Sequence, residues 1–97
     1  MPKILFEWDQ EKDLNNQKKH RINFIEAIKV FEDPQRIISK DLKHSDYEDR
    51  FYCIGKVKDL ILTVRYTYRK KIIRIFGAGY WRQGKAIYEK NKGKIHS

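Results

Sequence analysis

The strongest constraint on the fold is a ten-residue alternation of side chains between residues 60 and 69. One set of positions is apolar throughout: Leu60, Leu62, Val64, Tyr66 and Tyr68. The positions between them are mostly polar or basic: Ile61, Thr63, Arg65, Thr67 and Arg69. Because successive side chains of a strand point to opposite faces, this pattern predicts a long β-strand with one face in a core.

Shorter segments predict four further strands and three helices. The strands are expected at residues 4–8, 36–40, 50–55 and 71–77. Asp9 suits the N-cap of a polar helix that ends near Lys19, with Leu14 as its main apolar anchor. Asn23 and Glu26 resemble a capping box. The helix that they begin has an apolar stripe at helical spacing: Phe24, Ala27, Ile28 and Phe31.

Asp33-Pro34 ends this second helix, and residues 80–92 predict a third. Strands joined by short turns, with helices over their apolar face, predict an α+β fold with an antiparallel meander. A length of 97 residues is that of a single domain, here residues 1–97.

The charge is concentrated in the last third of the chain. The whole sequence has 22 Lys and Arg against 13 Asp and Glu, a formal net charge of +9. Residues 1–68 contribute 13 basic and 12 acidic side chains, whereas residues 69–97 contribute nine basic residues against Glu89 alone. Such a surface is typical of a domain that binds a polyanion, usually nucleic acid. The alternative is a domain that carries excess lysine without such a partner.

Several classes of protein are excluded by what the sequence lacks. The single Cys53 lies in an apolar run and is expected to be a small buried side chain. His20, His44 and His96 have no spacing typical of zinc ligands, so we expect neither a metal nor another cofactor. No apolar stretch has the length of a membrane helix and no signal-peptide core follows Met1, which predicts a cytoplasmic protein without membrane contact.

The hairpin that follows residue 60 brings arginines together. With Arg69-Lys70 as a two-residue turn, Arg65 would face Arg74 across the ladder. Two facing guanidinium groups repel unless an anion lies between them. That anion could be a carboxylate of the acidic loop, which holds Asp46, Glu48 and Asp49, or a phosphate of a substrate.

Two other groups of residues allow both a structural and a functional interpretation. Lys18, Lys19 and His20 end the first helix, where cations are favoured by the helix dipole, yet a lysine and an imidazole can also transfer protons. In the third helix Trp81, Gly84 and Tyr88 share a side. This side suits packing on the core, or a platform on which a base stacks.

Taken together, several motifs resemble one known family. They are Phe6-Glu7-Trp8-Asp9, the segment Asn15 to Lys19-His20, Phe24-Ile25-Glu26-Ala27 and Phe31-Glu32-Asp33-Pro34 in the first third. They continue with His44, Glu48 with Arg50, the run Val64 to Arg69, Ile73-Arg74-Ile75 and Tyr88-Glu89. In order and spacing these motifs resemble the BrnT-type toxins of bacterial toxin–antitoxin modules over almost the whole chain.

The resemblance implies a RelE-like fold and a ribonuclease that inhibits translation without a metal ion. It also implies a BrnA-type antitoxin with a ribbon-helix-helix end, in a hetero-oligomer that contacts operator DNA only through the antitoxin. Carried over by motif, the catalytic residues would be Lys19, His20, Arg69 and Arg74. The residues expected to bind RNA are Arg65, Arg50, Arg82, Lys85 and Glu48. The alternative function is a basic module without catalysis that binds an antitoxin or nucleic acid.

The sequence departs from the family pattern at two places. Arg21 stands where family members often have glycine after the Lys-His pair. In a left-handed conformation an arginine there would cost about 1 kcal/mol relative to glycine. Gly77-Ala78-Gly79 replaces a Ser-Ala-Arg segment, so a basic residue is missing, and we expect the two glycines to turn the last strand sharply into the closing helix.

Overall fold

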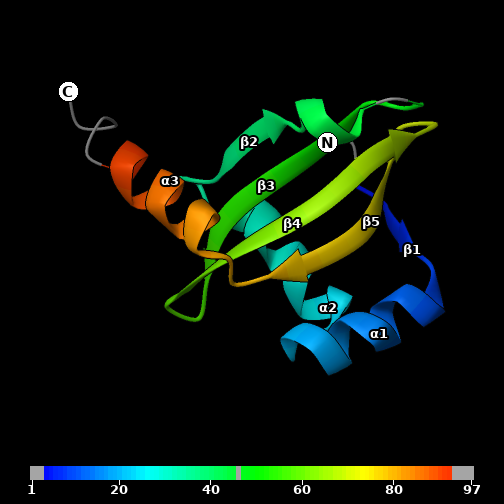
Figure 1. The fold of residues 1–97 in the computed structure, drawn as a ribbon, viewed down its shortest axis with the longest axis horizontal. Helices are drawn as coiled ribbons and strands as arrows, with labels where there is room; N and C mark the ends of the chain where they lie inside the picture. The colour runs from blue at the N-terminus through cyan, green and yellow to red at the C-terminus, as the bar shows by residue number, and fades with distance from the viewer. Residues whose placement is uncertain (1–3, 46, 93–97) are drawn as a thin grey trace.

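The protein folds into one five-stranded sheet with helices on both faces (Figure 1). The structure is a computed structural model and describes residues 4–45 and 47–92. The strands are β1 (Phe6–Trp8), β2 (Ile37–Lys40), β3 (Arg50–Val57), β4 (Leu60–Arg69) and β5 (Ile72–Gly79). The helices are α1 (Gln10–His20), α2 (Phe24–Ala27) and α3 (Arg82–Lys92), with 3-10 helices η1 (Ile28–Glu32) and η2 (Leu42–His44). The predicted α+β class is confirmed.

The sheet is mixed rather than wholly antiparallel. Its strand order is β1-β5-β4-β3-β2, and β2 to β5 form the expected antiparallel meander. The first strand, however, lies parallel to the last, with Phe6 beside Ile73 and Trp8 beside Ile75. The predicted meander is confirmed, and the parallel pairing of the first strand at this edge was not foreseen. The pairing of two strands at opposite ends of the chain is a long-range contact, which local patterns do not encode.

The β4–β5 hairpin has a different register from the predicted one. Its two-residue turn is Lys70-Lys71, and both residues have positive φ angles, 52° and 69°. Such turns match the twist of the strands. This turn pairs Arg74 with Thr67, and a β-bulge at Phe76 shifts the rest of the ladder, so that Arg65 lies opposite Gly77. The predicted pairing of Arg65 with Arg74 was therefore wrong, and so was the turn at Arg69-Lys70.

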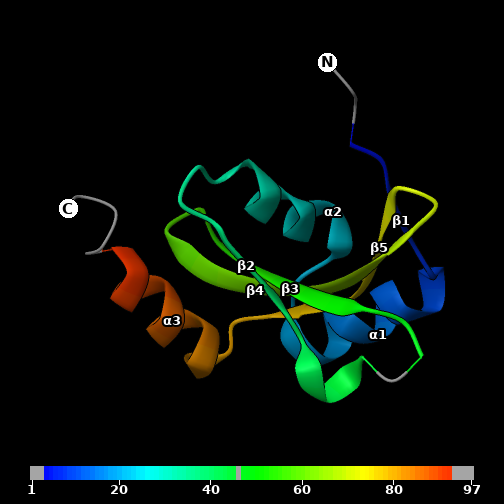
Figure 2. The same cartoon turned by 90° about the horizontal axis from the view of Figure 1, so that it is seen from above.

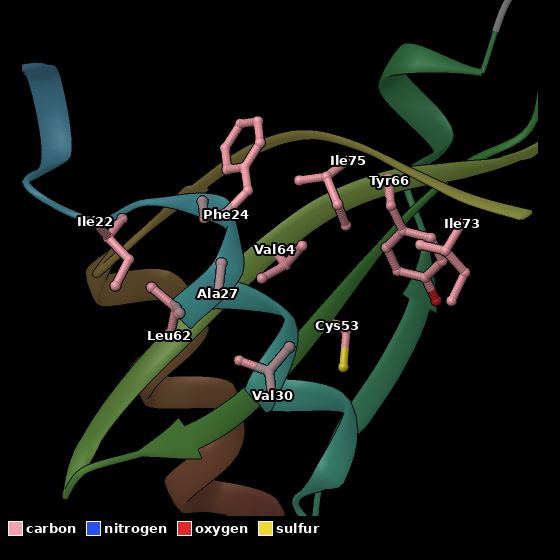
Figure 3. Packing of buried hydrophobic residues seen from close by; sticks show 11 residues of the cluster. Ile22, Phe24, Ala27, Val30, Cys53, Leu62, Val64, Tyr66, Ile73 and Ile75 are labelled. Atoms are coloured by element: carbon pink, nitrogen blue, oxygen red, sulfur yellow. The ribbon is translucent and has the colours of Figure 1, made fainter. Parts of the chain in front are cut away.

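The main core lies between one face of the sheet and the segment α2–η1. Figure 3 shows Phe24, Ala27 and Val30 from this segment in one cluster with Leu62, Val64 and other sheet residues. Phe24 and Ala27 are completely buried, while Ile28 and Phe31 pack at the margin, so the predicted apolar stripe is confirmed. Cys53 is buried in the same cluster, and burial raises the pKa of its thiol to about 12.

Helix α3 covers part of the opposite face of the sheet (Figure 2). Gly84 permits this contact, since a Cβ atom there would collide with Thr63 Oγ1. The Tyr88 hydroxyl donates a hydrogen bond of 2.7 Å to Asp33 Oδ2, which fixes the far end of the helix. Gly84 and Tyr88 thus pack as predicted, whereas Trp81 lies at the rim of a cavity described below. None of the helices in residues 4–45 and 47–92 is both long and apolar enough to span a membrane.

Gly77 and Gly79 do not form the sharp turn that we expected. Both belong to β5, and neither has a positive φ angle. Gly79 is needed for another reason, because a Cβ atom at this position would lie 2.9 Å from the indole of Trp81. The glycine that replaces the basic residue of the family pattern therefore makes room for Trp81.

Candidate functional site

Helix α1 carries the predicted Lys-His pair and is held by polar groups. Its N-cap Asp9 accepts hydrogen bonds from the amides of Glu11 and Lys12, as predicted. Leu14, the expected apolar anchor, is half exposed, so that prediction was wrong. The buried residues of the helix are Asp13 and Asn16.

Asn16 makes three hydrogen bonds to the main chain. Its Nδ2 donates to Ile22 O at 3.0 Å and to Ala78 O at 2.9 Å, while its Oδ1 accepts from Ala78 N at 3.1 Å. Asp13 Oδ1 accepts from Phe24 N at 2.9 Å. These bonds dock α1 against β5 and the start of α2, and so they determine where the end of α1 lies.

The end of α1 places Lys19 and His20 directly before a strained residue. Arg21 has φ 57° and ψ 33°, the left-handed conformation, and its amide donates to Gln17 O at 2.9 Å. The left-handed conformation, which the sequence analysis considered for this position as a condition, is the one that Arg21 adopts. Arginine is tolerated there at a cost, since its Cβ crowds the backbone in this conformation.

Arg21→Gly is expected to raise the free energy of unfolding by about 1 kcal/mol, because glycine adopts this conformation without strain. Urea denaturation measures the change. Arg21→Ala is the control, because it removes the charge but keeps the Cβ atom, and it should give no comparable gain. An equal gain for both variants would show that charge repulsion, not backbone strain, is relieved.

A cavity of about 350 Å³ is lined by residues of α1, η2 and the strands β3, β4 and β5. Lys19 and His20 reach it from α1, Arg50 and Arg65 from β3 and β4, and His44 from η2. The other lining residues are Lys12, Asn15, Asn16, Asp41, Phe51, Phe76, Gly77 and Trp81. The cavity therefore combines four Lys or Arg side chains and two histidines with one carboxylate.

Aromatic rings position the two arginines of this cavity. The Arg65 guanidinium lies 4.9 Å from the ring centre of Trp81, and that of Arg50 lies 4.4 Å from the ring centre of Phe76. His20 packs edge-on against Trp81 at 5.2 Å. A guanidinium that stacks on a ring keeps its hydrogen-bond donors available. Among the described residues, the ion pairs include Arg50, with Glu48 at 4.0 Å, but not Arg65.

The carboxylate of the cavity belongs to Asp41. His44 Nδ1 donates a hydrogen bond of 2.8 Å to Asp41 Oδ2. Burial by itself raises the pKa of Asp41, but the hydrogen bond and charge of His44, the amide of Lys43 and the charge of Arg65 outweigh it and lower that pKa below its ordinary value. Asp41 is therefore ionised at neutral pH.

The structure separates the predicted site residues into two groups. Lys19, His20, Arg50 and Arg65 line the cavity. Arg69 and Glu48 lie outside it and face each other, with Arg69 Nη2 3.4 Å from Glu48 Oε1. The acidic loop was one possible partner for the pair Arg65 and Arg74. In the structure its Glu48 pairs with Arg69 instead. Asp46, another residue of that loop, lies outside the described residues.

Arg74 also lies outside the cavity lining, and it forms an ion pair with Glu7 of the neighbouring strand β1. Because β1 runs parallel to β5, Glu7 lies beside Arg74. This carboxylate could not be foreseen without the strand pairing. Arg82 lines an adjoining groove, whereas Lys85 lines neither the cavity nor the groove.

The adjoining groove has a volume of about 680 Å³ and lies between α3, η2 and the sheet. It shares four lining residues with the cavity: Asp41, His44, Arg65 and Trp81. Its other lining residues include Tyr52 and the cations Lys40, Lys43 and Arg82. The two spaces therefore form one continuous basic depression with Arg65 and Trp81 at the junction.

Our sequence analysis did not assign a functional role to Lys12, Asp41, His44 or Phe76. An Asp-x-x-His spacing was the one local signal for Asp41 and His44, since a helical turn brings such residues together. Phe76 reaches the cavity through the pairing of β5 with β4, and Lys12 through the docking of α1. No local sequence pattern indicates that Phe76 or Lys12 lines the cavity.

Within residues 4–45 and 47–92, no group of three or more His, Cys, Asp or Glu side chains has the arrangement of a metal site. No curated protein matches the sequence at a significant level. A model of the family described as BrnT, the ribonuclease toxin of type II toxin–antitoxin systems, matches residues 8–84. This match covers most of the chain and includes all the cavity residues. The chain therefore belongs to the BrnT family of ribonuclease toxins, whose members act with a protein antitoxin.

Proposed function

We propose that this protein is an endoribonuclease that cleaves RNA without a metal ion and thereby inhibits translation. One observation carries the proposal: the cavity brings together Lys19, His20, Arg50 and Arg65, with both guanidinium groups stacked on aromatic rings. Fixed cations of this kind stabilise the negative charge that a phosphodiester gains in the transition state. The family to which the chain belongs supports the same activity.

The reaction that suits these residues is attack by the RNA's own 2′-hydroxyl on the adjacent phosphorus. The new O2′–P bond forms as the P–O5′ bond breaks, leaving a 2′,3′-cyclic phosphate and a 5′-hydroxyl. The attack requires one group that removes the 2′-hydroxyl proton and another that protonates the leaving oxygen. In this proposal Arg65 and Arg50 bind the phosphate, while Lys19 or His20 performs one of the two proton transfers.

The adjoining groove gives a single strand of RNA a path beyond the reacting phosphate. A base next to that phosphate would stack on Trp81 or enter the groove over Tyr52, and Arg82 would bind the following phosphate. Bases are accessible to aromatic side chains only when they are unpaired. We therefore propose single-stranded RNA, such as messenger RNA, as the substrate.

For its regulation we propose a BrnA-type antitoxin with a ribbon-helix-helix end, which neutralises the toxin in a cytoplasmic hetero-oligomer. Contact with operator DNA would come only through that antitoxin. In this proposal Arg69, Glu48 and Arg74, which form ion pairs, belong to the surface around the cavity and take no part in the reaction itself.

Cleavage by the purified, antitoxin-free protein tests this function. A single-stranded RNA incubated with the protein in EDTA is expected to yield fragments with cyclic-phosphate and 5′-hydroxyl ends. The same sequence with 2′-O-methyl groups should remain intact, because it lacks the attacking hydroxyl. RNA that stays intact with folded protein, while still binding to it, would instead support the alternative of a basic module without catalysis.

A further inference from the structure

The cavity contains a carboxylate–imidazole pair at the short helix η2, an element separate from α1. His44 Nδ1 and Asp41 Oδ2 are 2.8 Å apart, and both residues line the cavity. The short helix η2 holds the pair, with His44 N bonded to Asp41 O at 3.3 Å and Ser45 Oγ bonded to the same carbonyl at 2.6 Å. The Asp41 side chain is only 17 % exposed, whereas that of His44 is 53 % exposed. The carboxylate is thus set behind a ring that solvent and substrate can reach.

This hydrogen bond determines which ring nitrogen of His44 is available. An ionised carboxylate accepts only, so Nδ1 must carry the hydrogen. In the neutral ring the Nε2 atom then has a free lone pair and can accept a proton. When it does, the carboxylate stabilises the positive charge that appears on the ring. The same arrangement orients the catalytic base in Ser-His-Asp triads.

The topology brings this pair and the Lys-His pair to the cavity from two different elements of the fold. Helix α1 packs against β5, whereas η2 directly follows β2 at the other edge of the meander. Figure 2 shows the blue helix α1 and the short green helix η2 as separate elements on the same side of the sheet. In an in-line displacement the attacking and leaving oxygens lie on opposite sides of phosphorus. A base from η2 and an acid from α1, two separate elements, can meet this requirement.

We propose that His44 is the general base of RNA cleavage and that Asp41 is its positioning residue; this inference rests on the proposed ribonuclease function. His44 Nε2 takes the proton of the 2′-hydroxyl as O2′ bonds to phosphorus, and His20 or Lys19 gives a proton to O5′ as the P–O5′ bond breaks. The charged groups that share the cavity with His44 are Asp41, His20, Lys12, Lys19, Arg50 and Arg65.

The first test compares catalysis with binding. His44→Gln is expected to lower kcat at least 100-fold, because glutamine cannot accept a proton at neutral pH. Binding of a 2′-O-methyl RNA, measured by fluorescence anisotropy, should change less than threefold. Added imidazole should restore part of the activity of His44→Ala. Since His44 is half exposed, both variants should keep the melting temperature of the wild type.

The second test concerns Asp41. Asp41→Asn is expected to lower kcat about tenfold with KM unchanged, and Asp41→Glu should recover part of this loss. If the wild type cleaves RNA and the kcat of His44→Gln is not reduced, the inference about His44 is overturned, whereas the ribonuclease function stands. Loss of binding together with activity would also overturn it, since His44 would then be a binding residue. Absence of cleavage by the wild type is the failure of the proposed function itself.

Discussion

Arg65→Ala is expected to lower the rate of RNA cleavage about 100- to 1,000-fold, the loss typical of removing one transition-state hydrogen-bond donor. Arg65 lies at the junction of the cavity and the groove, and its guanidinium is 4.9 Å from the ring centre of Trp81. Arg65 is an exposed residue of β4 and is not part of the core, so the substitution removes no core packing. The effect should therefore be on kcat and not on stability.

Single-turnover kinetics and thermal unfolding together measure this outcome. Arg65→Lys retains the charge but not the planar donors, and it should recover only part of the activity. Lys29→Ala is the matched control, because this cation lies on η1, over the opposite face of the sheet, and pairs with Glu26 at 3.1 Å. Equal cleavage rates for Arg65→Ala and the wild type would show that Arg65 has no role in catalysis.

Asn16→Ala is expected to lower the free energy of unfolding by about 3 kcal/mol. The substitution removes three hydrogen bonds, each worth about 1 kcal/mol, and leaves both main-chain groups of the buried Ala78 without this partner. Because Asn16 docks α1 on β5, the variant should also displace Lys19 and His20 and reduce cleavage.

Asn15→Ala is the control for this prediction. Asn15 is the neighbouring residue on the same helix and is exposed, so its substitution should change the free energy of unfolding by less than about 0.5 kcal/mol. Urea denaturation of both variants measures the difference. Similar midpoints for the two would mean that the buried amide does not hold the helix.

The elements whose signals are local were predicted well. The alternation of residues 60–69 predicted β4, Asp9 predicted the start of α1, and Asn23 predicted that of α2, with Asn23 Oδ1 accepting from Glu26 N at 2.8 Å. Each of these signals depends on side chains within a few residues, such as a cap or a two-residue period. The family resemblance likewise needed only the order of the motifs, and the match to residues 8–84 confirmed it.

The composition of the cavity depended on contacts between distant residues. Arg74 had the sequence context of a catalytic residue, but the parallel pairing of β1 with β5 gave it Glu7 as a partner. Arg65 became free of Arg74 because the turn lies at Lys70-Lys71, one residue later than predicted, which pairs Arg74 with Thr67. A shift of one residue moves a side chain to a new partner or to the other face, and no local pattern specifies it.

The sequence by itself thus determined the strands, the helix caps, the basic character and the family. Only the tertiary structure decided which cations share a cavity, because strand pairing and the docking of α1 through Asn16 bring together residues from α1, β3, β4 and η2. The physical reason is that a side chain's charge is a property of its type, whereas its neighbours are a property of the folded chain.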